Sequence, residues 1–455
     1  MKRSKSEKSN ADIMATQETT GSYLVVLGEE VSASHLCEIA GLGGVASADD
    51  FKDSAMSIAN VGGANVLHFP RLGVAVVHAD EDQAHSLHTA AAEKSKVLAI
   101  EPERIMYALN RPVSAADLTM LPMDSGPPTL VTTGSKLDLA YLRGYRDAVN
   151  ALVDRLVGQE ESVEEFAAQA FNEAMATWGL QAIRVLTSRF TGRGIKVAVL
   201  DTGMDMTHPD FAGRGIVGMS FIDNEPVQDG HGHGTHCIGT ACGPKQPRQQ
   251  PRYGIACEAT IYAGKVLSNC GSGADRGILA GMEWAVSQGC QVISMSLGSP
   301  TQLNEPPSQT YETVARRALT GGTLIVAAAG NDSWRPETVK PVSRPANCPS
   351  IMAVGAVGSE FQLAPFSNGA LNPNGGQVDI AGPGMDVHSS ANCRTSRRMS
   401  GTSMAAPHVA GVAALLAQSD PRLRGQALWQ ALTALARRLP LPATDVGAGL
   451  VQAPQ

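Results

Sequence analysis

Short apolar runs alternate with helical segments from residue 178 to the end of the chain. The runs are KVAVL, TIYAGKVL, QVISMSLG, TLIVAAAG and IMAVGAVG. Apolar strands that alternate with helices are typical of a parallel sheet with helices on both faces. The pattern therefore predicts an α/β domain over residues 178–455.

A smaller α/β unit is predicted over residues 22–109. Strands are expected at Tyr23–Leu27 and Leu72–Val77, and a helix at Asp80–Ala92. Val97–Tyr107 is expected to form one more strand, with a break at its proline. These elements predict a short sheet that is covered by helices on one face.

The remaining segments are polar or rich in turn residues. Residues 1–21 are predicted to be disordered, and residues 110–177 to form a linker. Within that linker, apolar residues at three- and four-residue spacings predict a helix over 136–157. We interpret the acidic cluster that follows, at 160–165, as a solvated helix start.

Charge and hydropathy exclude several classes of partner. The net charge of −7 argues against nucleic acid or an anionic membrane as the main partner. No apolar stretch approaches the length that spans a bilayer. The basic start, MKRSKSEKSN, has no apolar run after it, so it does not resemble a secretory signal. We therefore expect a cytoplasmic protein whose eight cysteines are mostly reduced, with secretion by another route as the alternative.

Three segments carry the residue types of a charge-assisted serine nucleophile. VAVLDTG places Asp201 directly after an apolar strand, DGHGHGTH supplies histidines, and GTSMAAPH supplies Ser403 before an apolar helix. A serine oxygen is a poor nucleophile at neutral pH and needs a base, which in turn needs an orienting acid. The chain order of these residues, Asp then His then Ser, is one of the known arrangements of such a triad.

VAVLDTG, GHGTH and GTSMAAPHVAG resemble the three active-site segments of the subtilisin family, and DGHGHGTHC is most similar to its proteinase K branch. The resemblance implies Asp201 as the orienting acid, His233 as the general base and Ser403 as the nucleophile. AAAGN resembles the family's oxyanion segment. It implies that the Asn331 amide and the Ser403 N–H donate to the developing oxyanion.

The resemblance also implies where an extended substrate lies. Ser296, Leu297 and Gly298 resemble the strand that pairs with substrate, which is recognition by strand addition. Ala328 and Gly330 are expected to line the cleft. Small residues near Ser343, without an acidic neighbour visible in the sequence, favour an apolar or aromatic residue before the cut.

The histidines have a second interpretation. His231, His233 and His236, together with Cys237, are residue types that suit zinc. The interleaved glycines favour the triad instead, so no metal site is predicted. We interpret His236 as a packed structural histidine and Cys237 as a small buried residue, although the resemblance also implies sensitivity to mercurials.

Residues 22–109 resemble the family's inhibitory propeptide, a small ferredoxin-like α+β domain whose C-terminal tail would lie in the cleft. An unrelated binding domain is the alternative. Because the predicted linker separates this unit from the catalytic part, maturation could fall just after Leu109, within the linker, or nowhere.

No cofactor is expected. Many relatives bind calcium just after the histidine helix, but residues 243–252 at that place have no carboxylates, which calcium prefers. Other calcium sites stay possible. We expect a monomer that acts on polypeptides, with its own propeptide as intramolecular inhibitor.

The predicted function is a serine endopeptidase that is made as a self-inhibited zymogen and works through an acyl-enzyme on Ser403. One alternative is a peptide macrocyclase or ligase, in which an amine resolves the acyl-enzyme. The other is an inactive binding protein that keeps the fold.

Overall fold

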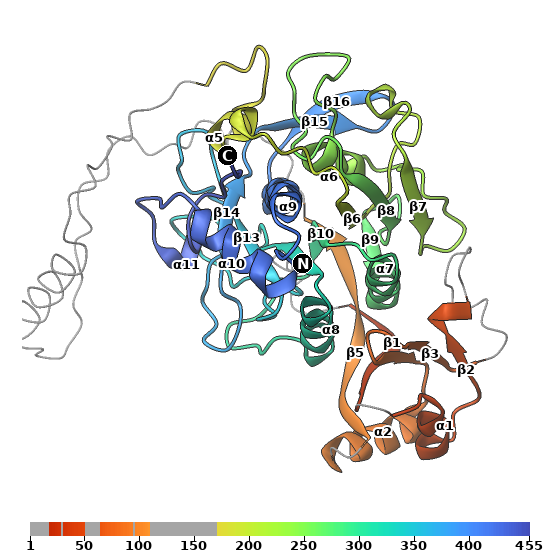
Figure 1. The fold of residues 1–455 in the computed structure, drawn as a ribbon. Coiled ribbons are helices and arrows are strands. Elements are labelled where there is room, and N and C mark those ends of the chain that lie inside the picture. Colours follow the sequence, from red (N-terminus) through yellow and green to blue (C-terminus); the bar gives the residue numbers. More distant parts are fainter. Residues whose placement is uncertain (1–17, 29–30, 51–63, 94–95, 110–170) are drawn as a thin grey trace, which may run out of the picture. The chain divides into compact units, whose positions relative to one another are not determined.

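The computed structural model of the chain describes residues 18–28, 31–50, 64–93, 96–109 and 171–455 (Figure 1). The predicted helix over 136–157, the acidic cluster at 160–165 and most of segment 1–21 lie outside these residues. In the described part, no helix is both long and apolar enough to span a membrane. All eight cysteines are described, and none of them forms a disulfide.

A sheet of seven parallel strands forms the centre of the C-terminal part. The strand order is β14, β13, β12, β10, β6, β8, β7. The strands span Lys196–Asp201 (β6), Ile216–Ser220 (β7), Thr260–Lys265 (β8), Val292–Met295 (β10), Leu324–Ala328 (β12), Met352–Val357 (β13) and Ile380–Pro383 (β14). Apart from the edge strand β7 they are almost wholly buried, as expected for a parallel sheet covered on both faces. The predicted α/β architecture is confirmed.

Helices cover both faces, and successive residues of a strand point to opposite faces. In β6, Val197 and Val199 belong to one apolar core cluster, whereas Ala198 and Leu200 belong to another. The first cluster includes side chains of α6, α9 and α10, and the second includes side chains of α7 and α8. The helices span Trp178–Ala182 (α5), His233–Cys242 (α6), Asp275–Ser287 (α7), Gln309–Thr320 (α8), Thr402–Ser419 (α9), Gly425–Leu435 (α10) and Ala443–Val446 (α11).

The N-terminal part has its own sheet. Its strands lie in the order β5, β1, β4, β3, β2, and all pairs are antiparallel except β2 with β3. Its elements span Thr19–Leu27 (β1), Ser34–Ala40 (α1), Val45–Ser47 (β2), Val66–Phe69 (β3), Val74–Val77 (β4), Glu81–Glu93 (α2) and Val97–Ala108 (β5). Without the short β2, this is the β-α-β-β-α-β order of a ferredoxin-like fold. The first strand begins at Thr19, before the predicted strand start at Tyr23 and the predicted start of the unit at residue 22.

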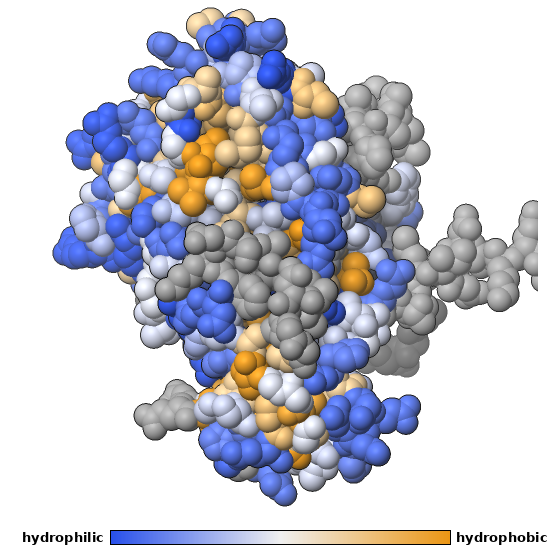
Figure 2. Space-filling view, turned by 90° about the vertical axis from the view of Figure 1, so that its right-hand side faces the viewer, coloured by the Kyte–Doolittle hydropathy of each residue, from blue (hydrophilic) through white to orange (hydrophobic). Residues whose placement is uncertain are grey.

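Both faces of the N-terminal sheet are covered. Val25 and Val77 pack with Leu36 of α1 and Leu87 of α2 in one apolar cluster. Residues of the opposite face, such as Leu24 and Val26, join the cluster of the C-terminal part that contains α7 and α8. Figure 1 shows these two helices between the central sheet and the N-terminal sheet. The face of the molecule seen in Figure 2 is mostly hydrophilic, with apolar side chains in small groups.

Strand β5 connects the N-terminal strands to two short strands that lie outside the central sheet. Its first part pairs with β1, and its last residues pair with β9 (Ser272–Ala274) and β11 (Leu297–Gly298) of the C-terminal part. The predicted break at the proline is wrong, since Pro102 lies opposite Tyr23 within a continuous strand. There β5 has a strand on one side only, so a residue without an N–H is tolerated.

Candidate active site

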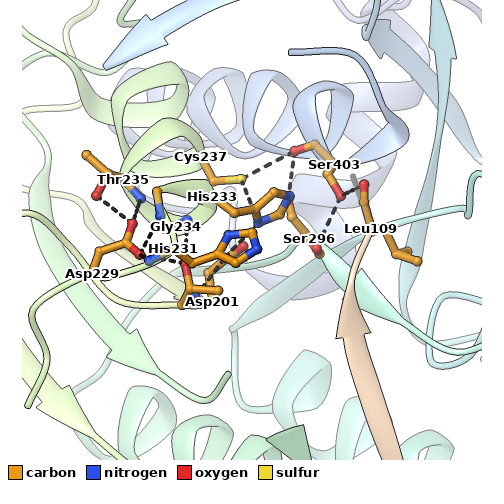
Figure 3. Close-up of polar contacts among 12 residues, drawn as sticks. Leu109, Asp201, Asp229, His231, His233, Gly234, Thr235, Cys237, Ser296 and Ser403 are labelled. Atoms are coloured by element: carbon orange, nitrogen blue, oxygen red, sulfur yellow. Dashed lines mark hydrogen bonds and ion pairs between the residues drawn. The ribbon is translucent and has the colours of Figure 1, made fainter. Parts of the chain in front are cut away.

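Asp201 is the last residue of β6, at the edge of the sheet where parallel strands end. Its carboxylate is buried, and Oδ1 lies 2.7 Å from Nδ1 of His233. The N–H of Thr202 donates to the same oxygen over 2.7 Å. The acid therefore holds the imidazole ring in one orientation from below (Figure 3).

His233 is the first residue of α6 and is also buried. Burial lowers the pKa of His233, but the Asp201 carboxylate and the Cys237 sulfur outweigh this effect, so its pKa lies well above the ordinary value. Its Nε2 is buried and has no hydrogen-bond partner within the described part of the chain. That nitrogen is therefore the one available to accept a proton.

Ser403 lies in the first turn of α9, just after the hairpin of β15 (Val387–Ala391) and β16 (Thr395–Met399). Its hydroxyl donates to the carbonyl oxygen of Leu109 and lies 3.1 Å from that of Ser296. The three predicted triad residues thus meet at one place, with Asp201 bonded to His233 and the serine hydroxyl turned to the end of the N-terminal part (Figure 3).

Asn331 follows β12 and faces the same carbonyl. Its Nδ2 donates to the Leu109 oxygen over 2.6 Å. Its Oδ1 accepts from both the N–H and the hydroxyl of Thr402, each at 2.9 Å. These two bonds leave the amide only one orientation, in which the NH₂ group points at the carbonyl. A bond from the Ser403 N–H to this oxygen stays a prediction.

The other predicted cleft residues surround the end of β5. Leu297 lies opposite Ala108 in an antiparallel pair, and the Leu109 N–H donates to the Ser296 oxygen over 3.2 Å. A Cβ at Gly298 would lie 2.5 Å from the Arg344 carbonyl oxygen and 3.1 Å from a Leu109 methyl carbon, so a side chain there would crowd both.

Gly330 and Ala328 are held by other contacts. Gly330 has φ of 113°, and a Cβ there would lie 2.2 Å from the Ser343 hydroxyl, so only glycine fits. Its N–H donates to the Thr402 hydroxyl over 3.1 Å. Ala328 is buried in β12 opposite Val354, so its place in the cleft stays a prediction.

Several functional contacts were missed in the sequence. Strand β9 pairs with β5 on the side opposite β11, and the Ala108 N–H donates to the Gly271 oxygen over 2.9 Å. The segment SGA of β9 has no apolar pattern that would have revealed it. Asp229 accepts from the backbone N–H groups of His231, Gly232 and Thr235 and so fixes the loop before His233. Its position at the start of DGHGHGTH was the available signal.

Asp332 was also missed. In the sequence, no acidic residue was visible near Ser343 and its small neighbours. In the structure, however, the Asp332 carboxylate lies 3.3 Å from the Ser343 hydroxyl and 3.1 Å from the Asn368 amide nitrogen. It directly follows Asn331, which was the available signal.

His236 and His408 bond to backbone carbonyls. Nε2 of His236 lies 3.0 Å from the Val387 oxygen, and burial lowers its pKa to about 3. Nδ1 of His408 lies 2.8 Å from the Met404 oxygen, and burial lowers its pKa to about 4. Such neutral, bonded rings are typical of structural histidines.

A metal does not fit the active site well. Among the described residues, the only grouping with ligand atoms close together is Asp201, His233 and Cys237. The first two already bond to each other, and burial raises the pKa of the Cys237 thiol, which keeps it protonated. The zinc interpretation therefore gains no support.

A calcium ion does not fit the loop after α6 either. Asp210 lies beside this loop, and both of its carboxylate oxygens already accept hydrogen bonds. The Arg248 N–H donates to one over 2.8 Å, and the Tyr253 hydroxyl donates to the other over 2.6 Å. Protein donors thus take the place that a cation would need.

Comparisons with known proteins identify the family of this chain. A model of the subtilase family matches residues 192–449. Subtilisin E of Bacillus subtilis (strain 168) is 42% identical over 234 residues, which is 51% of this chain and 58% of that protein. Subtilisin of Bacillus pumilus is 42% identical over 234 residues, 51% of this chain and 80% of that protein. M-protease of Shouchella clausii (strain KSM-K16) is 41% identical over 263 residues, 57% of this chain and 64% of that protein. The match thus spans little more than half the length of subtilisin E, and the chain belongs to the subtilase family.

Proposed function

We propose that this protein is a serine endopeptidase that forms an acyl-enzyme on Ser403. One observation carries the proposal: the Leu109 carbonyl lies between the Asn331 amide and the Ser403 hydroxyl, beside the Asp201–His233 pair. A carbonyl held by an amide donor next to a serine nucleophile is the arrangement that acyl transfer requires.

In this mechanism the Ser403 oxygen attacks the carbonyl carbon and gives its proton to Nε2 of His233. Asp201 stabilises the imidazolium that forms, and Asn331 donates to the oxyanion. His233 then gives the proton to the leaving amine, and the peptide carbonyl stays bonded to Ser403. Water, activated by the same histidine, releases the product and restores the serine.

The N-terminal part is proposed to be the inhibitory propeptide, bound as a substrate. Its last described strand lies between β9 and β11 and so adds a strand to the cleft. Two carboxylates of the same strand also bond to the amino ends of surface helices: Glu101 accepts from the Gln309 N–H of α8, and Glu103 accepts from the Arg276 N–H of α7. Because Leu109 occupies the place of the residue before the cut, we propose Leu109–Asn110 as the maturation bond.

The same arrangement favours an apolar residue before the cut. The Leu109 side chain packs partly buried against the apolar core, next to Gly298. The carboxylate of the nearby Asp332 accepts a hydrogen bond from the Ser343 hydroxyl. This bond favours a polar structural role for Asp332 over pairing with a basic substrate side chain. Peptides with Leu or Phe before the cut are expected to be cleaved faster than the same peptide with Arg, and equal rates would contradict this preference.

The test is labelling with a fluorophosphonate, followed by mapping of the labelled peptide. The processed wild type is expected to gain one adduct on Ser403, and Ser403→Ala none. A chain that is not labelled after its N-terminal part has been removed would favour the inactive binding protein. If the labelled enzyme joins peptides without gain of water in the product mass, it is a ligase or macrocyclase instead.

A further inference from the structure

Arg104 is the sixth residue of the N-terminal strand when Leu109 is counted as the first. It contacts the catalytic part through both its backbone and its side chain. Its N–H donates to Oδ2 of Asp275 over 2.9 Å, and its Nη1 lies 3.0 Å from Oε1 of Glu305. The substrate-like contacts of β5 therefore extend beyond the residues that pair with β9 and β11.

Asp275 is held in place by groups of the catalytic part. It is the first residue of α7 and is completely buried. The Tyr311 hydroxyl donates to Oδ1 over 2.8 Å, and Nη2 of Arg344 lies 3.2 Å from Oδ2. These partners fix the Asp275 carboxylate without the help of Arg104. Its Oδ2 is therefore already oriented toward the substrate strand before that strand binds.

Glu305 is fixed by its own loop, which connects β11 to α8. The Gln302 N–H donates to Oε2 over 2.8 Å, and Oε1 is the oxygen that lies next to the arginine. The buried amide of Asn372 donates to the backbone oxygens of Gln302 and Glu305 over 3.1 and 3.3 Å. A carboxylate held in this way loses little freedom when it pairs with a cation.

We propose that Asp275 and Glu305 form a subsite that recognises an arginine at the sixth position before the cut. Asp275 accepts the backbone N–H of that residue, whatever its side chain, and Glu305 selects for positive charge. The inference rests on the proposed endopeptidase activity and names the class of substrate: polypeptides with a basic residue at this distance from an apolar cut site. Both charged side chains are about one-fifth exposed, at 20% and 22%, so the pair is partly shielded from solvent.

The test uses the full chain, allowed to process itself, with active sites counted by fluorophosphonate labelling. Three acetylated peptides are compared: RIMYALNR, which copies residues 104–111, and its versions with Gln or Glu in first place. We expect kcat/KM for the Arg peptide to exceed that for the Gln peptide about fivefold, because a partly exposed ion pair contributes up to about 1 kcal/mol. The Glu peptide should be cleaved more slowly still.

Variants of the enzyme separate charge from structure. Glu305→Gln keeps an oxygen for the Gln302 N–H but is expected to lose the preference for Arg over Gln, and Glu305→Lys is expected to favour the Glu peptide. Glu258→Lys is the control, since it makes the same charge change in another Glu–Arg pair, with Arg193 at 2.6 Å, just before β8. It should keep the wild-type preference.

The outcomes are distinguishable. Equal kcat/KM for the three peptides, in an enzyme that cleaves all of them, overturns the subsite and leaves the proposed function intact. An arginine preference that survives Glu305→Gln also overturns it. Failure both to label and to cleave overturns the proposed function, and the subsite with it.

Discussion

Glu103 is expected to be the strongest single polar anchor of the N-terminal part on the catalytic part. It is completely buried, and its carboxylate accepts from Arg276 three times: from the backbone N–H at 3.0 Å, from Nε at 2.7 Å and from Nη2 at 2.5 Å. The Thr20 hydroxyl donates as well. Glu103→Gln keeps the size of this side chain but removes its charge and turns one acceptor into a donor.

The magnitude follows from the burial of the pair. Removing one partner of a buried ion pair costs about 3–5 kcal/mol, because the other charge is left without compensation. Arg276 is 28% exposed and can recover some hydration, so the lower end, about 3 kcal/mol, applies. Since about 1.4 kcal/mol corresponds to tenfold in an equilibrium constant, the dissociation constant of the N-terminal part should rise about 100-fold.

The assay is the appearance of peptidase activity when the processed chain is diluted, which reports the dissociation constant of the inhibitory complex. Asp49→Asn is the control, because its pair with Arg71 is 48% and 43% exposed and is worth about 0–1 kcal/mol. Activity of Glu103→Gln should appear at much higher concentration than that of wild type, and that of Asp49→Asn near the wild-type value. If both variants dissociate at the same concentration, the reasoning from burial is refuted.

Three further predictions concern catalysis and stability. Asn331→Leu should lower kcat about 100- to 1000-fold with little change in KM, a range that comes from a subtilisin, and a change in KM alone would argue against the oxyanion role. Because the pKa of His233 is raised, its imidazole stays protonated to higher pH than an ordinary histidine. The rate constant kcat/KM should therefore fall as the pH drops through this pKa. A kcat/KM that does not change from pH 5 to 9 would contradict the role of His233 as general base. Tyr253→Phe removes a hydrogen bond to the Asp210 carboxylate and should lower the free energy of unfolding by about 1–2 kcal/mol, measured by denaturant titration in a Ser403→Ala background. Added calcium should not restore that loss.

The residues proposed for catalysis could be predicted because each lies in a short motif whose local structure is set by its neighbours. Asp201 ends an apolar strand, and Ser403 begins an apolar helix. Parallel strands end at one edge of the sheet, so residues that follow them meet there whatever their separation in sequence. The same rule accounts for Asn331 after β12.

The remaining contacts depend on how separate elements dock. The family resemblance implies that the tail ending near Leu109 lies in the cleft, but it does not indicate which carbonyl bonds to the Asn331 amide, more than two hundred residues away. Likewise, Glu103 is one acidic residue among many until β5 is placed against α7. The orientation of the Ser403 hydroxyl also could not be predicted, because it depends on which carbonyl occupies the cleft.

The most direct test of the whole account is to map the ends of the fragments that the purified full-length chain produces on standing. The account predicts that wild type is cut between Leu109 and Asn110 and that Ser403→Ala stays intact under the same conditions. A first cut elsewhere would contradict the placement of Leu109 as the residue before the scissile bond. A cut at the same bond in Ser403→Ala would show that another enzyme makes it and would contradict self-processing by Ser403.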